Sequence, residues 1–293
     1  MSDHGPRLRI GVPKKGRIAE KVAELLKGCD IRYTKPARLD IATAKNLPIE
    51  LVFLPAADIA MYVADGCVDL GITGQDIIRE TGLPVKEEVT LDIGACRLCV
   101  QWPVKNGFSN VKDLLGKRCV TSFPKITKEY FDELAGNAEH GTDIKVLHGS
   151  VEASVGMGLA ECVVDLVETG DTMRAAGLDV ASTIMDSQAV MISNPNSIHQ
   201  EMIAYLKKRV VGYLTATKFY YMVYNVHKDN IVAAEKVTPG KRSPTVSTLE
   251  DPSWKSVSVL VKRSEVQLIM DKLETIGATD ILVWDVRNTR GFE

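Results

Sequence analysis

The chain has 293 residues and a formal net charge of −2, and 45% of its residues are hydrophobic. This length favours two or three domains, with enough apolar residues for a core in each. The mixed, nearly balanced charge argues against a nucleic-acid-binding protein. No apolar run reaches the roughly 18 residues of a membrane span, and the N-terminal sequence has no signal-peptide core.

The six cysteines are scattered and lie mostly in apolar, strand-like stretches. Cys96 and Cys99 have CxxC spacing, but neither a second pair nor a histidine is near them in the sequence. Zinc binding is therefore not favoured. We expect a reduced, soluble, cytoplasmic protein.

The chain opens with a predicted strand, Leu8–Val12, a basic loop, Pro13–Arg17, and an amphipathic helix, Ile18–Lys27. The loop differs from a P-loop because Arg17 stands in the lysine position and Ile18 in the Ser/Thr position. A nucleoside-triphosphatase is therefore not predicted. The loop suits an anionic phosphate, although a solvated charged turn has the same composition.

Two further strands, Ile49–Leu54 and Val68–Ile72, alternate with the predicted helices Ala57–Asp65 and Ile77–Glu80. This order predicts a parallel sheet, in which ligands bind beyond the carboxyl ends of the strands. Thr73 lies at such an end.

From Asp92 onward the pattern changes to an alternating strand, Ala95–Trp102, which indicates a second lobe. Further expected elements are the helices 111–115 and 127–135 and the strands 118–121, 144–147, 180–185 and 189–192. A long helix is expected over 198–217.

The most informative stretch is a strand, Cys162–Val167, followed by a polar loop, Glu168–Thr172, and a short helix from Met173. Backbone N–H groups at the start of a helix, two threonine hydroxyls and Gly170 can hold a phosphate. An ordinary capped helix after a core strand would have a similar composition.

The acids around this loop, Asp165, Glu168 and Asp171, would repel a bare phosphate. They can accept hydrogen bonds from ribose hydroxyls, or bind Mg²⁺ directly or through water. A phosphorylated sugar therefore fits the loop better than free phosphate.

The segment from Phe219 to the end reads βαββαβ, the order of a ferredoxin-like unit of about 75 residues. It contains no obvious catalytic constellation, so we predict a regulatory or assembling role.

Several stretches together resemble the ATP phosphoribosyltransferase family, the first enzyme of histidine biosynthesis. The family's signature is matched at Glu152, Gly158, Ala160, Val163, Asp165, Leu166, Thr169, Gly170, Thr172 and Met173. Its Lys-x-Gly-Arg motif is matched at Lys14, Gly16 and Arg17, and the similarity continues at Arg38-Leu39 and Asp69–Gly74. Leu54–Asp58 replaces an arginine-containing segment of many bacterial relatives, so a nucleotide contact there is not implied.

The resemblance implies an α/β fold: a two-lobed catalytic core similar to periplasmic binding proteins, followed by a ferredoxin-like regulatory domain. The expected boundaries are 1–92 with 186–216 for the first lobe, 93–185 for the second and 217–293 for the regulatory domain.

The implied reaction transfers the phosphoribosyl group of phosphoribosyl pyrophosphate (PRPP) to N1 of ATP, with release of pyrophosphate and with Mg²⁺ as cofactor. The resemblance places PRPP at Asp165, Glu168, Thr169, Gly170, Asp171 and Thr172, with Asp165 and Glu152 as catalytic residues and Asp165 and Glu168 as candidate Mg²⁺ ligands. The residues that the resemblance implies for binding ATP and phosphate are Lys14, Gly16, Arg17, Arg38, Asp69 and Thr73.

The family's long form is inhibited by histidine and associates from dimers into hexamers. Asn225 and Thr245 are the expected histidine contacts. Two alternatives are a ligand receptor on the same two-lobed scaffold and a phosphoribosyltransferase with another acceptor. The absent export signal weighs against the first, and the match across both lobes and the tail weighs against the second.

Overall fold

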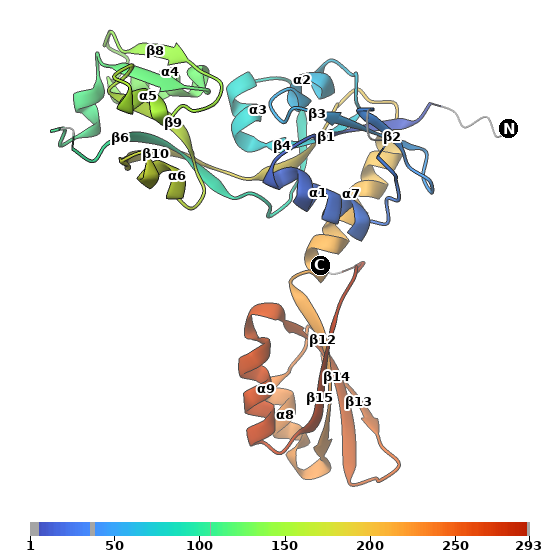
Figure 1. Cartoon of the computed structure of the whole chain (residues 1–293). Coiled ribbons are helices and arrows are strands. Elements are labelled where there is room, and N and C mark those ends of the chain that lie inside the picture. Colours follow the sequence, from blue (N-terminus) through green and yellow to red (C-terminus); the bar gives the residue numbers. More distant parts are fainter. Residues whose placement is uncertain (1–5, 36–38, 106, 292–293) are drawn as a thin grey trace. The chain divides into compact units, whose positions relative to one another are not determined.

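The computed structural model describes residues 6–35, 39–105 and 107–291 (Figure 1). The chain forms two compact units. One contains the described residues up to Glu24 together with Ile31–Ile203, and the other contains Leu25–Asp30 and the chain from Ala204 onward. Among the described residues, no helix is both long and apolar enough to cross a membrane.

The first unit begins with a six-stranded sheet in the order β2-β3-β1-β4-β11-β5. Strands β3, β1 and β4 are parallel, while β11 runs antiparallel between β4 and β5. The strands are β1 (Leu8–Pro13), β2 (Ile41–Thr43), β3 (Ile49–Leu54), β4 (Leu70–Gly74), β5 (Lys86–Thr90) and β11 (Ala189–Ser193). The helices are α1 (Arg17–Gly28), which belongs to this unit up to Glu24, α2 (Ile59–Ala64) and α3 (Gln75–Thr81).

Every residue of β4 is buried, and its sequence LGITG contains no charged side chain. Helix α2 packs so closely on this strand that a Cβ at Gly71 would lie only 2.5 Å from Cγ2 of Ile59. A glycine is thus needed for the close approach of helix and sheet.

The second sheet has the order β10-β6-β9-β7-β8. Strands β8, β7 and β9 are parallel, and β6 and β10 complete the sheet in antiparallel pairs. The elements are β6 (Cys96–Pro103), a 3₁₀ turn (Val111–Leu114), β7 (Arg118–Thr121), α4 (Pro124–Leu134), β8 (Asp143–Val146), α5 (Ala153–Gly156), β9 (Cys162–Val167), α6 (Asp171–Ala175) and β10 (Leu178–Ser187).

The chain crosses between these two sheets twice, after β5 and after β10. The expected two-lobed α/β core is therefore confirmed. Two of its elements were not predicted: β5, whose sequence KEEVT is mostly polar, and α5, a single turn with the sequence ASVG.

The second unit contains α7 (Gln200–Ala216) from Ala204 onward and a four-stranded antiparallel sheet in the order β13-β14-β12-β15. Its elements are β12 (Phe219–His227), α8 (Ile231–Val237), β13 (Thr245–Thr248), β14 (Trp254–Lys262), α9 (Val266–Thr275) and β15 (Thr279–Asp285). This order confirms the predicted ferredoxin-like topology.

One face of this sheet forms a hydrophobic core with residues of α8 and α9, centred on Met222, Tyr224 and Val226 of β12. The hydroxyl of the fully buried Tyr224 lies 2.7 Å from that of Thr238, so its polar end is satisfied. The intervening residues of β12 lie on the opposite face.

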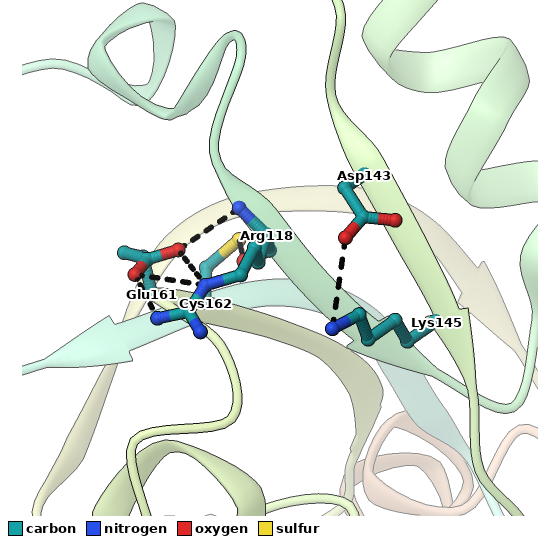
Figure 2. Close-up of polar contacts among 5 residues, drawn as sticks. All are labelled: Arg118, Asp143, Lys145, Glu161 and Cys162. Carbon is teal, nitrogen blue, oxygen red and sulfur yellow. Dashed lines mark hydrogen bonds and ion pairs between the residues drawn. The ribbon is translucent and has the colours of Figure 1, made fainter.

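An ion pair joins the amino-terminal ends of β7 and β9 in the second lobe (Figure 2). Glu161 Oε1 accepts a hydrogen bond from Nη2 of Arg118 at 2.5 Å, and Glu161 Oε2 accepts one from the backbone N–H of Arg118 at 2.9 Å. These bonds lower the pKa of Glu161 to about 2. The pair fixes the start of β9, the strand that carries Asp165.

We expect Glu161→Gln to lower the free energy of unfolding by only about 1 kcal/mol near neutral pH, because the pair is partly exposed and solvent screens it. The ordinary pKa is 4.5 and the folded value about 2, so this stabilisation is present above pH 4.5 and disappears towards pH 2. Urea unfolding across this range measures the effect, with the exposed Glu129→Gln as control. An equal loss at all pH values would contradict the assignment.

Candidate active site

The loop after β9 is held by its own polar contacts. Thr169 donates its hydroxyl to Asp171 Oδ2 at 2.6 Å, and Arg174 donates to both Asp171 Oδ1 and the Thr169 carbonyl, at 2.6 and 2.9 Å. Gly170 adopts φ = 80°, in the left-handed region. The loop is thus preorganised, with Asp171 committed to its internal bonds.

Asp165 lies half-buried on β9, three residues before the loop. Burial raises its pKa from 3.8 to about 6; the backbone N–H of Leu166 opposes this shift, and the charge of Glu152 adds to it. Leu166 donates that N–H to Asp165 Oδ1 at 2.8 Å. The electrostatic coupling places Glu152, just before α5, near Asp165.

A cavity of about 340 Å³ lies at the loop. Helix α1 of the first lobe contributes Ile18 and Lys21, while the second lobe contributes the whole loop. The lining residues are Ile18, Lys21, Gly94, Cys96, Leu166, Glu168, Thr169, Gly170, Asp171 and Thr172. The structure therefore brings the predicted PRPP loop together with a helix that sequence analysis did not connect to it.

Cys96, at the start of β6, also lines this cavity. Burial raises its pKa to about 11, and the charges of Asp76 and Glu168 contribute to the shift. The neutral thiol is therefore the dominant form near neutral pH.

The predicted basic loop precedes α1 directly. Lys14 forms an ion pair with Asp40 at 2.8 Å, and Gly16 has φ = 90° with open space around its Cα. The side chain of Arg17 and all of Arg38 lie outside the described residues. Thr73 is fully buried near the carboxyl end of β4 and donates its hydroxyl to the Ala56 carbonyl at 2.8 Å.

Asp69 precedes β4, so it lies about 13 Å along the strand from Thr73. Its carboxylate accepts the N–H of Arg9 at 2.8 Å and the hydroxyl of Ser197 at 2.6 Å. These bonds connect the amino-terminal ends of β1 and β4 with the segment after β11. The structure does not bring Asp69 together with Thr73.

A larger cavity, of about 850 Å³, adjoins Asp69 at this amino-terminal edge. Two of its charged side chains, Arg9 and Glu50, pair with each other at 3.3 Å. This cavity contains none of the loop residues that suit a sugar phosphate.

Polar contacts also join the two lobes beside the second crossing. Ser187, the last residue of β10, donates its hydroxyl to Asp76 Oδ1 at 2.5 Å and accepts the Asp76 N–H at 3.1 Å. Glu80 of α3 accepts the N–H groups of Lys125 and Ile126, at 2.8 and 2.9 Å. Phe123 stands at the N-cap position of α4 and has no side-chain acceptor, so it cannot cap the helix. Glu80 supplies the cap in its place.

In the second unit, Asn225 and Thr245 lie on the sheet face opposite Tyr224. Thr245 pairs with Ser258, which pairs with Val223, two residues before Asn225. Asn225 donates its amide to Asp280 Oδ2 at 3.0 Å, and Thr245 is exposed. The two predicted histidine contacts thus share one face but belong to different strands.

Comparison with known proteins agrees with this architecture. A family model described as HisG, ATP phosphoribosyltransferase, matches residues 55–212, and one described as HisG, C-terminal domain, matches residues 216–288. The chain is 46% identical over 286 residues to the ATP phosphoribosyltransferase of Yarrowia lipolytica and 43% identical over 288 residues to that of Saccharomyces cerevisiae. Each alignment covers 97% of both chains.

Among solved structures, one chain of the ATP phosphoribosyl transferase (HisG:HisZ) complex from Thermotoga maritima aligns with a TM-score of 0.61 and 25% identity. The alignment covers 70% of this chain and 96% of that one. The fold, together with these similarities, defines a phosphoribosyl-transferring enzyme of the glycosyltransferase class. The chain belongs to the ATP phosphoribosyltransferase family, which acts in histidine biosynthesis.

Proposed function

We propose that this enzyme transfers the phosphoribosyl group of PRPP to N1 of ATP, giving N1-(5-phosphoribosyl)-ATP and pyrophosphate. The observation that carries the proposal is the cavity shared by the loop 168–172 and helix α1. It offers hydroxyl and N–H donors for a phosphate beside carboxylates for a ribose, which is the combination that a phosphorylated sugar requires.

The second lobe binds the phosphoribosyl group. Thr172 donates its hydroxyl to the 5-phosphate, and Thr169 and Gly170 contribute backbone N–H groups, because the Thr169 hydroxyl is already donated to Asp171. Asp165 and Glu168 accept hydrogen bonds from the ribose hydroxyls. Asp171 maintains the loop conformation through its contacts with Thr169 and Arg174. Because these groups are in place before substrate arrives, little ordering is needed on binding.

The first lobe supplies positive charge. The phosphates of ATP or of the leaving pyrophosphate are bound by Lys14, Gly16, Arg17 and Arg38. Thr73 connects β4 to the segment around Ala56 through its hydrogen bond to the Ala56 carbonyl. The attacking atom is a ring nitrogen with a lone pair, so the reaction needs no general base. Glu152 acts electrostatically on Asp165, whose pKa it raises.

Mg²⁺ is the proposed cofactor. Among the described residues no group of three or more His, Cys, Asp or Glu side chains is arranged to hold a metal ion. Mg²⁺ usually binds to one or two carboxylates together with substrate phosphates, and Asp165 and Glu168 fit that role. The ion would neutralise charge on the pyrophosphate leaving group.

The second unit is proposed to bind histidine as a feedback inhibitor, through Asn225 and Thr245. Association from dimers into hexamers accompanies inhibition, and the enzyme acts in the cytoplasm. The lobes are proposed to comprise 1–92 with 186–216 and 93–185, and the regulatory domain 217–293. Feedback control of this kind requires a coupling free energy of about 1–3 kcal/mol between the two sites.

The test is an ultraviolet absorbance assay with PRPP, ATP, Mg²⁺ and pyrophosphatase, with and without histidine, because ribosylation at N1 changes the adenine spectrum. We expect product formation that histidine suppresses, and weaker suppression in Asn225→Ala. No product from folded protein would overturn the proposed reaction. Product formation that is indifferent to histidine would overturn only the regulatory assignment.

A further inference from the structure

The charges lining the active-site cavity are unbalanced for a phosphate ligand. A phosphate monoester carries about −1.5 to −2 charges near neutral pH. Asp171 and the nearby Arg174 pair at 2.6 Å and compensate each other's charge, so Glu168 leaves the described cavity wall with added negative charge. Hydroxyl and N–H groups of the loop contribute dipoles but no net positive charge, so a cation has to come from elsewhere.

Lys21 is the only cation among the described residues that line this cavity. It lies on α1 three residues after Ile18, on the same face of the helix, and both side chains border the cavity opposite the loop. Lys21 is exposed and forms no hydrogen bond or ion pair with any residue in the described part of the chain.

We propose that Lys21 is a substrate-binding residue that contacts the 5-phosphate of PRPP from the first lobe. The inference rests on the proposed reaction and extends it, because the phosphate would then be held from both lobes. A lysine suits this task, since its long side chain carries a compact charge that can follow the ligand into place.

The contact has a second consequence. A phosphate bound between Lys21 and the loop would link α1 of the first lobe to Thr169 and Thr172 of the second lobe. Binding of the phosphorylated end of PRPP therefore stabilises the arrangement of lobes in which this cavity is formed. Ribose without the phosphate would not do so.

The experiment compares Lys21→Met, Lys21→Arg and a matched control, Lys27→Met, with the wild-type enzyme. Lys27 is an exposed lysine on the same helix that does not line the cavity. Loss of a charged hydrogen bond predicts an about 10- to 100-fold higher KM for PRPP in Lys21→Met, with little change in kcat. Lys21→Arg should retain most of the affinity, and Lys27→Met should match the wild type.

Two inhibitors assign the contact to one end of PRPP. Competitive inhibition by ribose 5-phosphate should weaken in Lys21→Met, while inhibition by pyrophosphate should not change. A KM for PRPP within about twofold of the wild-type value would overturn the proposal, as would a loss confined to pyrophosphate. If the wild-type enzyme forms no product, the proposed reaction itself fails, which is a separate outcome from a normal Lys21→Met enzyme.

Discussion

Asp165→Asn is expected to stabilise the fold while removing most of the activity. The pKa of Asp165 is about 6 in the folded protein and 3.8 ordinarily, so burying its charge costs stability at neutral pH. The side chain is only half-buried, which reduces this cost to about 1–2 kcal/mol. Asparagine keeps an oxygen for the N–H of Leu166 without the charge.

The gain in stability should depend on pH in a defined way. Above pH 6 the wild-type carboxylate is ionised in both states, and the full difference between the proteins is present. As the pH falls through about 6, the folded carboxyl takes up a proton, and below 3.8 the difference disappears. Urea unfolding at several pH values measures it.

The activity of Asp165→Asn should fall by about 100-fold in kcat/KM for PRPP, because a charged acceptor of ribose hydrogen bonds is lost. The wild-type enzyme should also lose activity below pH 6, as Asp165 is protonated. Asp179→Asn is the matched control, since Asp179 accepts the N–H of the following residue at 2.8 Å but lies on β10, outside the strand that leads into the loop. Activity of Asp165→Asn within a few-fold of wild type would remove Asp165 from the site.

Gly170→Ala should produce the second large loss. A Cβ at this position would lie 2.7 Å from Nη1 of Arg174, and φ = 80° is unfavourable for alanine by about 1–2 kcal/mol. The guanidinium of Arg174 can shift to relieve this contact, but the shift disturbs the geometry of its Nη2 bonds to Asp171 and Thr169. We expect kcat/KM for PRPP to fall by about 10- to 100-fold, with little change in the affinity for ATP.

The control for this prediction is Gly177→Ala. Gly177 follows α6 with φ = 72°, and a Cβ added there would meet no heavy atom within 4 Å. The backbone cost is therefore similar, but the loop contacts remain. Equal losses of PRPP affinity in both variants would show that strain, and not the displacement of Arg174, is responsible.

Local sequence patterns predicted the elements that bury apolar residues. The run Cys162–Val167 forms β9, and the polar residues after it form the loop before α6, because both follow from short-range chemistry. The strand β5 was not predicted because it is mostly polar. The helix α6 begins at Asp171, two residues before the expected start.

Contacts between distant segments could not be predicted in the same way. Lys21 reads as an ordinary surface lysine of an amphipathic helix, and only the arrangement of the two lobes brings it to the cavity. Asp69 reads as part of a family motif next to Thr73, although the strand between them separates the two residues. Sequence therefore identifies the loop but not the residues that face it.

The cap that Glu80 provides to α4 has a consequence for motion. Any rotation that separates α3 from α4 must break both of its hydrogen bonds and leave the first available N–H groups of α4 without a partner. Loss of a helix cap costs about 1 kcal/mol. The cap therefore favours the arrangement in which α3 and α4 are in contact, and any rotation that separates the two helices carries a cost of about this size.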